Sequence, residues 1–349
     1  MRVRRLLPLL LAATVVVGCG DDSGAGDAAA KPKPVDAGTA VRTPAGLLRW
    51  MADNPARASL VVLPDRGTPL TYNPGRPMPL ASTRKVLIAG AAVEAGGLRG
   101  TIARSAVERF YVPGTDGGSH RKARLTAARL PLADVAEAML ALSDNAAADA
   151  LLERVGAARV DAWAAAQGMR EQDPIYPLLG EFAAWGRDAE WTQKSPRERA
   201  VEAAALARTV KPSEVVREPI ADSRSLTGAS VAGTAAEWAA LLRRIERGGT
   251  PQLRRLLSWP LRQTPKLRAK VSSFLAKGGT LDGVLTDVSY VRARGSRSGA
   301  AVALFLRDLP ADVQKTLRER FTQQTLAQQL ALDPAFREKA RAVLAPADD

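Results

Sequence analysis

The chain has 349 residues, of which 46% are hydrophobic and 25% are charged. These proportions are typical of a globular protein and exclude a wholly disordered chain, and the length suffices for one large domain or two smaller ones. The net charge of +14 would suit nucleic acid or anionic lipid as a partner. Because the basic residues are scattered and no nucleic-acid-binding motif accompanies them, we expect no nucleic-acid partner.

Cysteine and histidine are nearly absent, since Cys19 and His120 are the single examples of each. One cysteine cannot form an internal disulfide, and zinc sites usually take more than one His or Cys. We therefore expect no metal and no other cofactor. Nucleophilic catalysis in this chain would have to use a base other than imidazole, which favours a lysine-based mechanism.

The N-terminus has the pattern of an export signal. A basic segment at residues 1–5 precedes an apolar run at 6–17, which is too short for a comfortable membrane span. The residues 16–19, Val-Val-Gly-Cys, resemble a bacterial lipobox. This predicts a lipoprotein signal peptide over 1–18 and lipidation of Cys19, so the protein is expected to be exported and lipid-anchored to a bacterial membrane, on its periplasmic or extracytoplasmic face. The alternative is an ordinary secretory signal with an incidental cysteine.

Residues 19–43 are rich in Gly, Ala, Asp, Pro and Lys and predict a disordered tether. A domain over 44–349 follows. The run from Ser82 to the glycines at 96–97 is apolar all round, which predicts a buried helix capped by Ser82 or a neighbour and stopped by Gly.

The remaining elements follow from hydrophobic periodicity and turn residues. Helices are expected at 44–54, 131–139, 146–155, 160–167, 196–208, 235–245, 311–332 and 334–344, and strands at 58–63, 70–72, 272–276, 288–292 and 300–306. Strands at both ends of the chain indicate an antiparallel sheet flanked by helices, with an inserted all-α domain. The α/β part would comprise 44–97 and 235–349, and the helical part 98–234.

Three short motifs carry the chemistry. They are Ser-x-x-Lys at 82–85, Ser-Asp-Asn at 143–145 and Lys-Gly-Gly at 277–279. Positions i and i+3 share a helix face, so Lys85 can reach the Ser82 hydroxyl, and burial beside a second cation would lower the pKa of the lysine. Amides at the helix start would favour the developing negative charge of an acyl-transfer reaction.

Each motif has a plainer interpretation when taken alone. Ser-x-x-Lys occurs again at 119–122, in a polar Gly-rich stretch without an apolar helix behind it. Ser-Asp-Asn could be a helix-capping turn, and Lys-Gly-Gly could be an ordinary turn. The three motifs in this order and context nevertheless favour one shared site.

Together the motifs resemble those of class A β-lactamases and penicillin-binding proteins. The sequence around Ser82 (residues 79–90), the sequence around Ser143 (140–148) and the threonine-led helix start at 233–238 are similar to that family, and the likeness covers about 46–345. The resemblance implies an α/β domain and an all-α domain with the active site between them. The substrate would be a β-lactam or a peptidoglycan-like compound, and the protein a monomer.

The resemblance also implies residue roles. Ser82 would be the nucleophile and Lys85 its base, and Ser143 would relay a proton to the leaving nitrogen. On the substrate side, Asn145 would bind an amide and Lys277 would attract a carboxylate. Gly279 and Thr280 would line the site, with the Thr280 amide as the second oxyanion donor.

Two departures from the family pattern stand out. Gly278 occupies the place of a hydroxyl residue that helps to bind the substrate carboxylate. The family's omega-loop Glu-x-x-x-Asn pattern, whose glutamate activates the deacylating water, has no match between Ser143 and Thr234. Glu181 is the candidate by position and Glu190 a weaker one, but both fit ordinary exposed loop charges better.

Three functions are therefore open. The first is a β-lactamase-like serine hydrolase that acts through a Ser82 acyl-enzyme on β-lactams or related amides and esters. The second is a penicillin-binding, DD-peptidase-like protein with slow deacylation. The third is a non-catalytic lipoprotein that binds cell-wall polymers.

Overall fold

A computed structural model describes residues 37–96, 98–117, 127–185, 190–215 and 228–345. The predicted signal peptide, Cys19, His120 and the second Ser-x-x-Lys match at 119–122 lie outside the described residues. Within them, no helix is long and apolar enough to cross a membrane.

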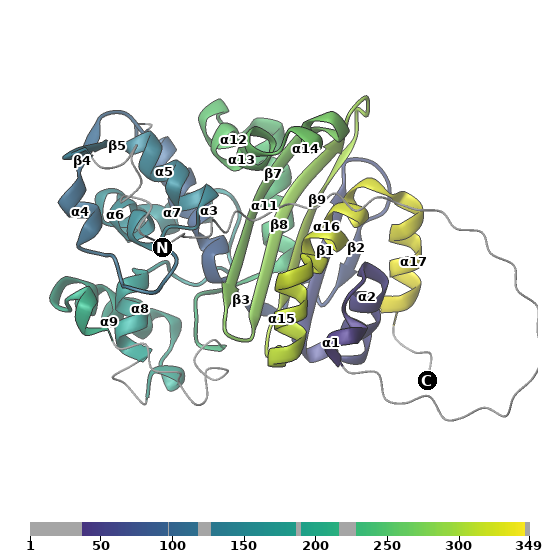
Figure 1. The fold of residues 1–349 in the computed structure, drawn as a ribbon, viewed down its shortest axis with the longest axis horizontal. Coiled ribbons are helices and arrows are strands. Elements are labelled where there is room, and N and C mark those ends of the chain that lie inside the picture. Colours follow the sequence, from purple (N-terminus) through teal and green to yellow (C-terminus); the bar gives the residue numbers. More distant parts are fainter. Residues whose placement is uncertain (1–36, 97, 118–126, 186–189, 216–227, 346–349) are drawn as a thin grey trace, which may run out of the picture.

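A five-stranded antiparallel sheet forms the centre of the molecule, in the order β2-β1-β9-β8-β7 (Figure 1). Its strands are β1 (Ala58–Pro64), β2 (Leu70–Tyr72), β7 (Val271–Leu281), β8 (Val284–Ala293) and β9 (Gly299–Leu306). The first two come from the start of the domain and the other three from its end, as predicted. β7 is an edge strand, and it contacts the turn that carries Ser82.

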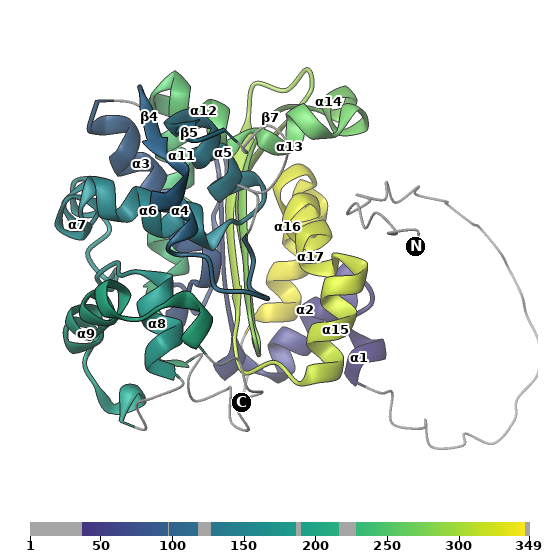
Figure 2. The same cartoon turned by 60° about the vertical axis from the view of Figure 1, so that its left-hand side comes forward.

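Helices cover both faces of the sheet (Figure 2). On one face lie α2 (Pro44–Asp53), α15 (Ala311–Arg320), α16 (Thr322–Leu332) and α17 (Pro334–Leu344), and on the other lies α11 (Ala235–Gly248). Because β9 is covered on both sides, all of its residues are buried, and it reads as a continuous apolar run. The predicted class, an antiparallel sheet flanked by helices, is confirmed.

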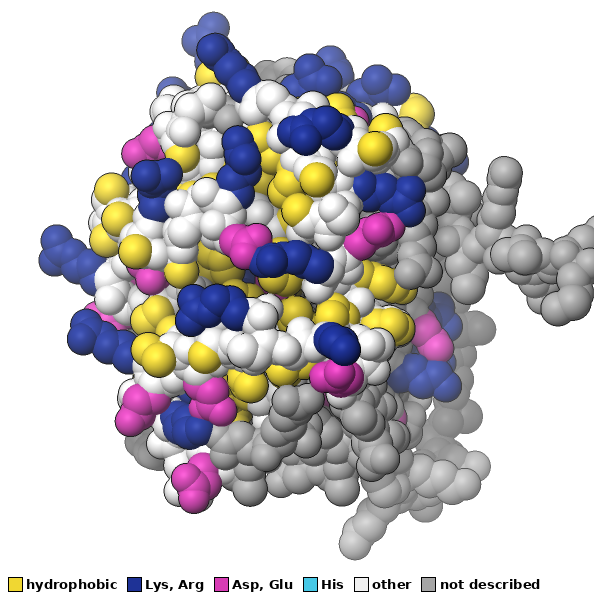
Figure 3. Space-filling model, turned by 90° about the vertical axis from the view of Figure 1, so that its left-hand side faces the viewer, with side chains coloured by type: hydrophobic (Ala, Val, Ile, Leu, Met, Phe, Trp, Pro, Cys, Tyr) yellow, Lys and Arg dark blue, Asp and Glu magenta, His cyan; other side chains and the backbone are white. Residues whose placement is uncertain are grey.

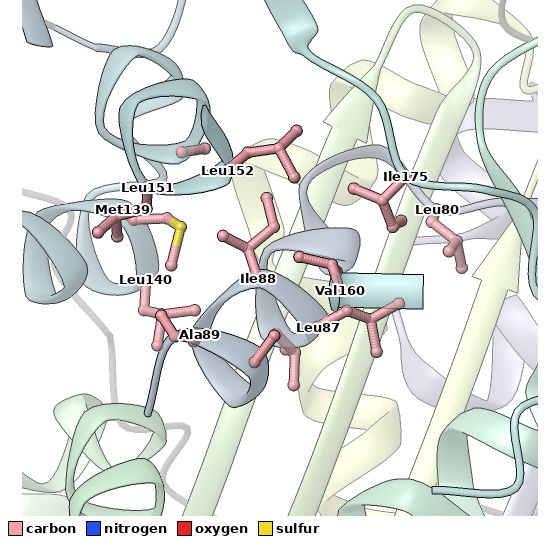
Figure 4. Close-up of a cluster of buried hydrophobic side chains, with 14 of the residues drawn as sticks. Leu80, Leu87, Ile88, Ala89, Met139, Leu140, Leu151, Leu152, Val160 and Ile175 are labelled. Carbon is pink, nitrogen blue, oxygen red and sulfur yellow. The ribbon is translucent and has the colours of Figure 1, made fainter. Parts of the chain in front are cut away.

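A largely helical part packs beside the edge strand. Its main helices are α4 (Arg104–Glu108), α5 (Leu132–Ala141), α6 (Asn145–Val155), α7 (Ala157–Ala166), α8 (Leu178–Trp185) and α9 (Pro196–Thr209). The helix α3 (Lys85–Glu94) contributes Leu87 and Ile88 to the apolar interior of this part (Figure 4). Gly90 lets α3 approach α7, since a Cβ there would lie 2.3 Å from the Trp163 ring.

Short elements complete the chain. They are α1 (Ala37–Ala40), η1 (Pro55–Arg57), β3 (Pro77–Pro79), η2 (Ala81–Arg84), β4 (Thr101–Ala103), β5 (Arg129–Pro131), η5 (Trp191–Gln193), η6 (Pro212–Glu214), β6 (Ala232–Thr234), α12 (Pro251–Leu257), α13 (Trp259–Gln263) and α14 (Pro265–Lys270). The pairs β3/β6 and β4/β5 form two small antiparallel sheets apart from the central one.

The predicted tether is too long at its C-terminal end. The helix α1 packs on α15, where the Gly38 amide donates to the Asp312 carboxylate over 3.0 Å, and Val41 is fully buried. Gly46 allows this approach, because a Cβ there would overlap the Ala40 carbonyl oxygen. Burial of Val41 and the absence of a side chain at Gly46 therefore draw residues 37–43 into the folded part.

Two further element predictions are wrong in detail. The long helix expected over 311–332 is two helices, because Phe321 adopts a left-handed backbone (φ 54°) between α15 and α16. The helix after Ser82 begins at Lys85, and Ser82 lies in the preceding 3₁₀ turn without acting as its cap.

The basic side chains are spread over the surface. On the face shown in Figure 3, Lys and Arg stand apart from one another, with acidic and apolar side chains between them. The positive charge of this face is thus dispersed, which is the distribution expected from the sequence.

Candidate active site

Ser82 lies in the turn η2, against the edge strand β7. The fit is close, since a Cβ on Gly279 would lie 2.7 Å from the Ser82 amide nitrogen and 2.8 Å from the Leu80 carbonyl oxygen. Only glycine can occupy this position without displacing the backbone. The predicted site residue Gly279 therefore sets the distance between the Ser82 turn and β7.

The turn is tied to the sheet by two hydroxyl groups. Thr83 Oγ1 lies 2.7 Å from Thr286 Oγ1 on β8, and the Thr286 hydroxyl donates to the Leu80 carbonyl oxygen over 3.1 Å. Ala81, directly before Ser82, has a φ of 47°, a conformation that costs energy for any residue with a side chain. The sheet contacts hold this strained turn in place and so fix the direction of the Ser82 side chain.

Lys85 begins α3 and is completely buried. Its Nζ lies 3.0 Å from Ser82 Oγ, 2.6 Å from the Ser143 carbonyl oxygen and 2.6 Å from Asn145 Oδ1. With Ser143 Oγ at 3.3 Å as a fourth neighbour, these oxygens surround the amine, and the Ser82 hydroxyl can donate to Nζ when the amine is neutral. The structure thus brings Ser82 and Lys85 together, as the i, i+3 spacing predicts.

The pKa of Lys85 is lowered well below its ordinary value. Burial is the largest cause, and the nearby positive charge of Lys277 adds to it, while Asp116 and Asp144 act in the opposite direction. A neutral amine at this position can accept the proton of the Ser82 hydroxyl. This is the condition that a lysine needs to serve as a general base near neutral pH.

The second motif lies between α5 and α6, and it both caps a helix and serves the site. The Asp144 carboxylate accepts from the Ala147 amide over 3.0 Å and caps α6. Its neighbours Ser143 and Asn145 turn toward Lys85 instead. Ser143 has a left-handed backbone (φ 55°), which aims its hydroxyl into the site. The two interpretations of this motif are therefore compatible.

Lys277 extends the same hydrogen-bonded chain. Its Nζ donates to Ser143 Oγ over 3.0 Å and to the Gly278 carbonyl oxygen over 2.6 Å, and Ser143 Oγ is also 3.3 Å from Lys85 Nζ. Burial lowers the pKa of Lys277 to about 8, against the raising effects of Asp116 and Asp287. One proton path thus connects Ser82, Lys85, Ser143 and Lys277.

The third motif lies inside a strand and not at a turn. The strand β7 continues to Leu281, so residues 277–280 occupy four consecutive ladder positions beside β8. Thr280 directly follows the close approach of Gly279 to Ser82. This is the position at which its amide could join the Ser82 amide as an oxyanion donor, as the resemblance implies.

Glu181 is buried, contrary to the expectation of an ordinary loop charge. It lies on α8 and forms an ion pair with Arg84, whose side chain is equally buried, while the Tyr176 hydroxyl lies 3.5 Å from its other oxygen. Burial of a carboxylate requires such a partner. Within the part of the chain that the structure describes, no hydrogen bond or ion pair joins Glu181 to Ser82 or Lys85.

Asp149 holds the segment before Glu181. It lies one turn beyond Asn145 on α6 and accepts from the amides of Leu178 and Leu179 over 2.8 and 2.7 Å. Burial raises the pKa of Asp149 to about 7, although the two amides and Arg84 lower it. Its two oxygens therefore face backbone amides.

Three residues of this region were missed by the sequence analysis: Arg84, Asp149 and Asp287. A signal existed for Arg84, because it lies between Ser82 and Lys85 at the start of the predicted buried helix, where a charge needs a buried partner. Asp149 follows Asn145 by four residues and so shares its helix face. Asp287 lies in the mixed stretch Thr286-Asp287-Val288-Ser289 of β8 and gave no comparable signal.

Comparisons with known proteins agree with this geometry. A family model described as the beta-lactamase enzyme family matches residues 46–330. No curated protein matches the sequence. A solved β-lactamase from Sphaerobacter thermophilus is similar in fold, with a TM-score of 0.51, 19% identity, and coverage of 81% of this chain and 97% of that one.

Two further class A structures give similar values. The ancestral β-lactamase GNCA has a TM-score of 0.51 and 20% identity, over 81% of this chain and 99% of its own. The extended-spectrum β-lactamase TLA-3 has a TM-score of 0.51 and 13% identity, over 80% and 98%. At these identities the likeness establishes the fold alone.

Proposed function

Because the chain belongs to the beta-lactamase enzyme family, we propose that it is a serine hydrolase that forms an acyl-enzyme on Ser82. The observation that carries the proposal is the pairing of Ser82 Oγ with the buried Lys85 Nζ, whose pKa is strongly lowered. The substrates would be β-lactams or related amides and esters.

In the acylation step, Ser82 Oγ attacks the substrate carbonyl carbon and the hydroxyl proton passes to the neutral Lys85 amine. The Ser82 and Thr280 amides would hold the oxyanion that forms. When the scissile bond breaks, the proton would move from Lys85 through the Ser143 hydroxyl to the leaving nitrogen. The distances from Lys85 Nζ to Ser82 Oγ (3.0 Å) and Ser143 Oγ (3.3 Å) support this route.

A second candidate is slow deacylation, as in a penicillin-binding, DD-peptidase-like protein. The observation that favours it is the ion pair between Arg84 and Glu181, since among the described residues no hydrogen bond or ion pair joins this candidate carboxylate to Ser82 or Lys85. Without a carboxylate to activate water, the ester on Ser82 would persist.

The experiment follows the mass of the purified protein after incubation with a labelled penicillin. A hydrolase gives a transient adduct and a penicillin-binding protein gives a stable one, and in both cases Ser82→Ala abolishes it. A total absence of adduct, with unchanged ester and amide hydrolysis in Ser82→Ala, would exclude both enzymes. The remaining candidate would then be a cell-wall-binding lipoprotein.

For the location, we propose export and attachment to a bacterial membrane through a lipid on Cys19, with the folded part acting as a monomer. The proposal is supported by the sequence pattern of residues 1–19. Expression of the full chain with a labelled fatty acid tests it. Label should enter the wild type and be lost in Cys19→Ala, and an unlabelled wild type would contradict the anchor.

A further inference from the structure

Asp287 is a buried acidic group close to the site that the proposed mechanism does not use. It lies on β8 with 7% of its side chain exposed, and no ion pair within 4 Å reaches its carboxylate among the described residues. Burial raises the pKa of Asp287 to about 7, against the lowering effects of Ser289 and Lys277. A buried carboxyl without a paired cation is costly unless it has a role.

The strand register places Asp287 beside Gly278. The two residues are direct partners in the ladder between β7 and β8, so they share one face of the sheet. The Thr286 side chain donates to the Leu80 carbonyl oxygen, so it lies on the face of the sheet that carries Ser82. Because side chains alternate along a strand, the neighbouring Asp287 points to the opposite face of the sheet. A ligand at the free edge of β7 would therefore have to pass over the backbone of Gly278 to reach the Asp287 carboxylate.

Gly278 leaves space between the edge of β7 and Asp287. A Cβ built on Gly278 would meet a single atom within 4 Å, the Thr286 carbonyl oxygen at 3.4 Å, so there is space where a side chain would stand. Gly278 is also partly exposed, and β7 has a free edge. Unlike Gly279, which is required by close packing, Gly278 therefore lacks a packing reason to be glycine.

Two carboxylates act electrostatically on Lys277. One is Asp287 on β8, and the other is the exposed Asp116, whose carbonyl oxygen accepts from the Asn145 amide. Above about pH 7, where Asp287 is ionised, a substrate carboxylate approaching Lys277 would also approach these two acidic groups, which would oppose its binding. A neutral group that carries hydrogen-bond donors meets no such repulsion.

We propose that Asp287 and Gly278 form a specificity subsite for the leaving group, which takes an uncharged amide or an ammonium group and disfavours a free carboxylate. The preferred substrates would then be esters or amides within a longer chain or amidated at their end. This inference rests on the proposed acylation of Ser82 and names the substrate class for it.

The test uses two thioesters with the same phenylacetylglycyl acyl group. One has thioglycolate as its leaving group and the other has thioglycolamide, so the two differ in one charge and give the same acyl-enzyme. Acylation of Ser82 is followed by mass and by thiol release. Each rate is divided by the rate with hydroxylamine in solution, which corrects for the different reactivity of the two thiols.

At about pH 8, where Asp287 is ionised, wild-type protein should prefer the amide by about tenfold, as expected for one desolvated charge contact. Asp287→Asn should reduce this ratio about fivefold or more, as expected when the repulsion is removed. The matched control is Asp282→Asn, an exposed carboxylate in the same hairpin, which should leave the ratio unchanged. Gly278→Thr, which fills the space between the edge of β7 and Asp287, should also lower the amide preference.

Equal corrected rates in the wild type, or a preference for the carboxylate, would overturn the subsite. So would equal ratios in Asp287→Asn and Asp282→Asn. The wild-type comparison needs no variant and therefore stands even where a substitution prevents folding. Failure of both thioesters and of penicillin to acylate Ser82 is a different result, and it would overturn the proposed function together with this inference.

Discussion

The Arg84 guanidinium is ion-paired with the Glu181 carboxylate inside the protein, and both side chains are inaccessible to solvent. The pair connects the residue before Lys85 with α8, so it joins the Ser82 turn to the segment where a deacylating carboxylate would be expected. The stacking of Arg84 on the Tyr176 ring, at 5.6 Å from its centroid, extends this contact.

Removal of one member of this pair should strongly destabilise the fold. Glu181→Ala leaves the Arg84 charge buried without a partner, which costs about 3–5 kcal/mol for buried pairs. The double variant Arg84→Leu/Glu181→Leu removes both charges and should regain most of that loss. Denaturant-induced unfolding measures the free energy of unfolding of the single and the double variant. A loss below about 1 kcal/mol in the single variant would show that the charge finds another partner or water.

The same ion pair predicts that Glu181 does not control the lifetime of the acyl-enzyme. Glu181→Gln should change the decay of the penicilloyl adduct by less than about threefold, whereas loss of a true general base costs about 10²–10⁴-fold. Glu190→Gln is the control, because Glu190 is exposed and was the weaker candidate. A hundredfold longer lifetime in Glu181→Gln alone would make Glu181 the deacylating base.

Lys85→Met should slow acylation of Ser82 by about 10²–10⁴-fold, because the general base is lost while the buried alkyl chain is kept. The unfolding free energy should not fall, since a buried amine with a lowered pKa opposes folding when it is charged. Lys266→Met, at an exposed position, is the control for loss of a lysine. Undiminished acylation in Lys85→Met would exclude the lysine mechanism.

Much of this site could be predicted from the sequence because its key contacts are local. The i, i+3 spacing places Lys85 on Ser82, and the helix start after Thr234 is capped as expected, with its hydroxyl accepting from the Glu237 amide. The site residues far apart in sequence, such as Ser143 and Lys277, were connected through the order of the motifs and the family resemblance.

The errors arise where tertiary contacts override local pattern. Two successive glycines usually indicate a turn, yet residues 278–279 continue a strand because Gly279 must pack on the Ser82 turn. Exposure was expected for Glu181 from its residue type, and its partner Arg84 is 97 residues away. The left-handed Phe321 that divides the C-terminal helix had no glycine or proline to announce it.

Acylation should decline on both sides of an optimum pH. On the acid side, protonation of Lys85 removes the base, and on the alkaline side, Lys277 loses its positive charge above about pH 8. Lys277→Arg keeps that charge at all accessible pH values, so its alkaline decline should move upward or disappear. The measurement is the rate of adduct formation from about pH 5 to about pH 10, a range in which both lysines can titrate. Folding of the protein is checked at each pH. An unmoved alkaline limb would assign it to another group.

Asp287 should make the fold less stable as the pH rises. Its pKa is raised from 3.8 to about 7 in the folded state, so between these values the folded protein binds the proton more tightly than the unfolded chain. The contribution of protonated Asp287 to the free energy of unfolding is therefore present at low pH and lost as the pH rises toward 7. The pKa shift sets an upper limit of about 4 kcal/mol on this contribution. Asp287→Asn removes this titration.

The variant should consequently gain stability over the wild type at pH 8 and approach it at pH 4, when unfolding free energies are compared at both values. Asp282→Asn, exposed in the same hairpin, should show no such divergence. Parallel pH profiles for Asp287→Asn and the wild type would mean that the buried carboxyl keeps its ordinary pKa.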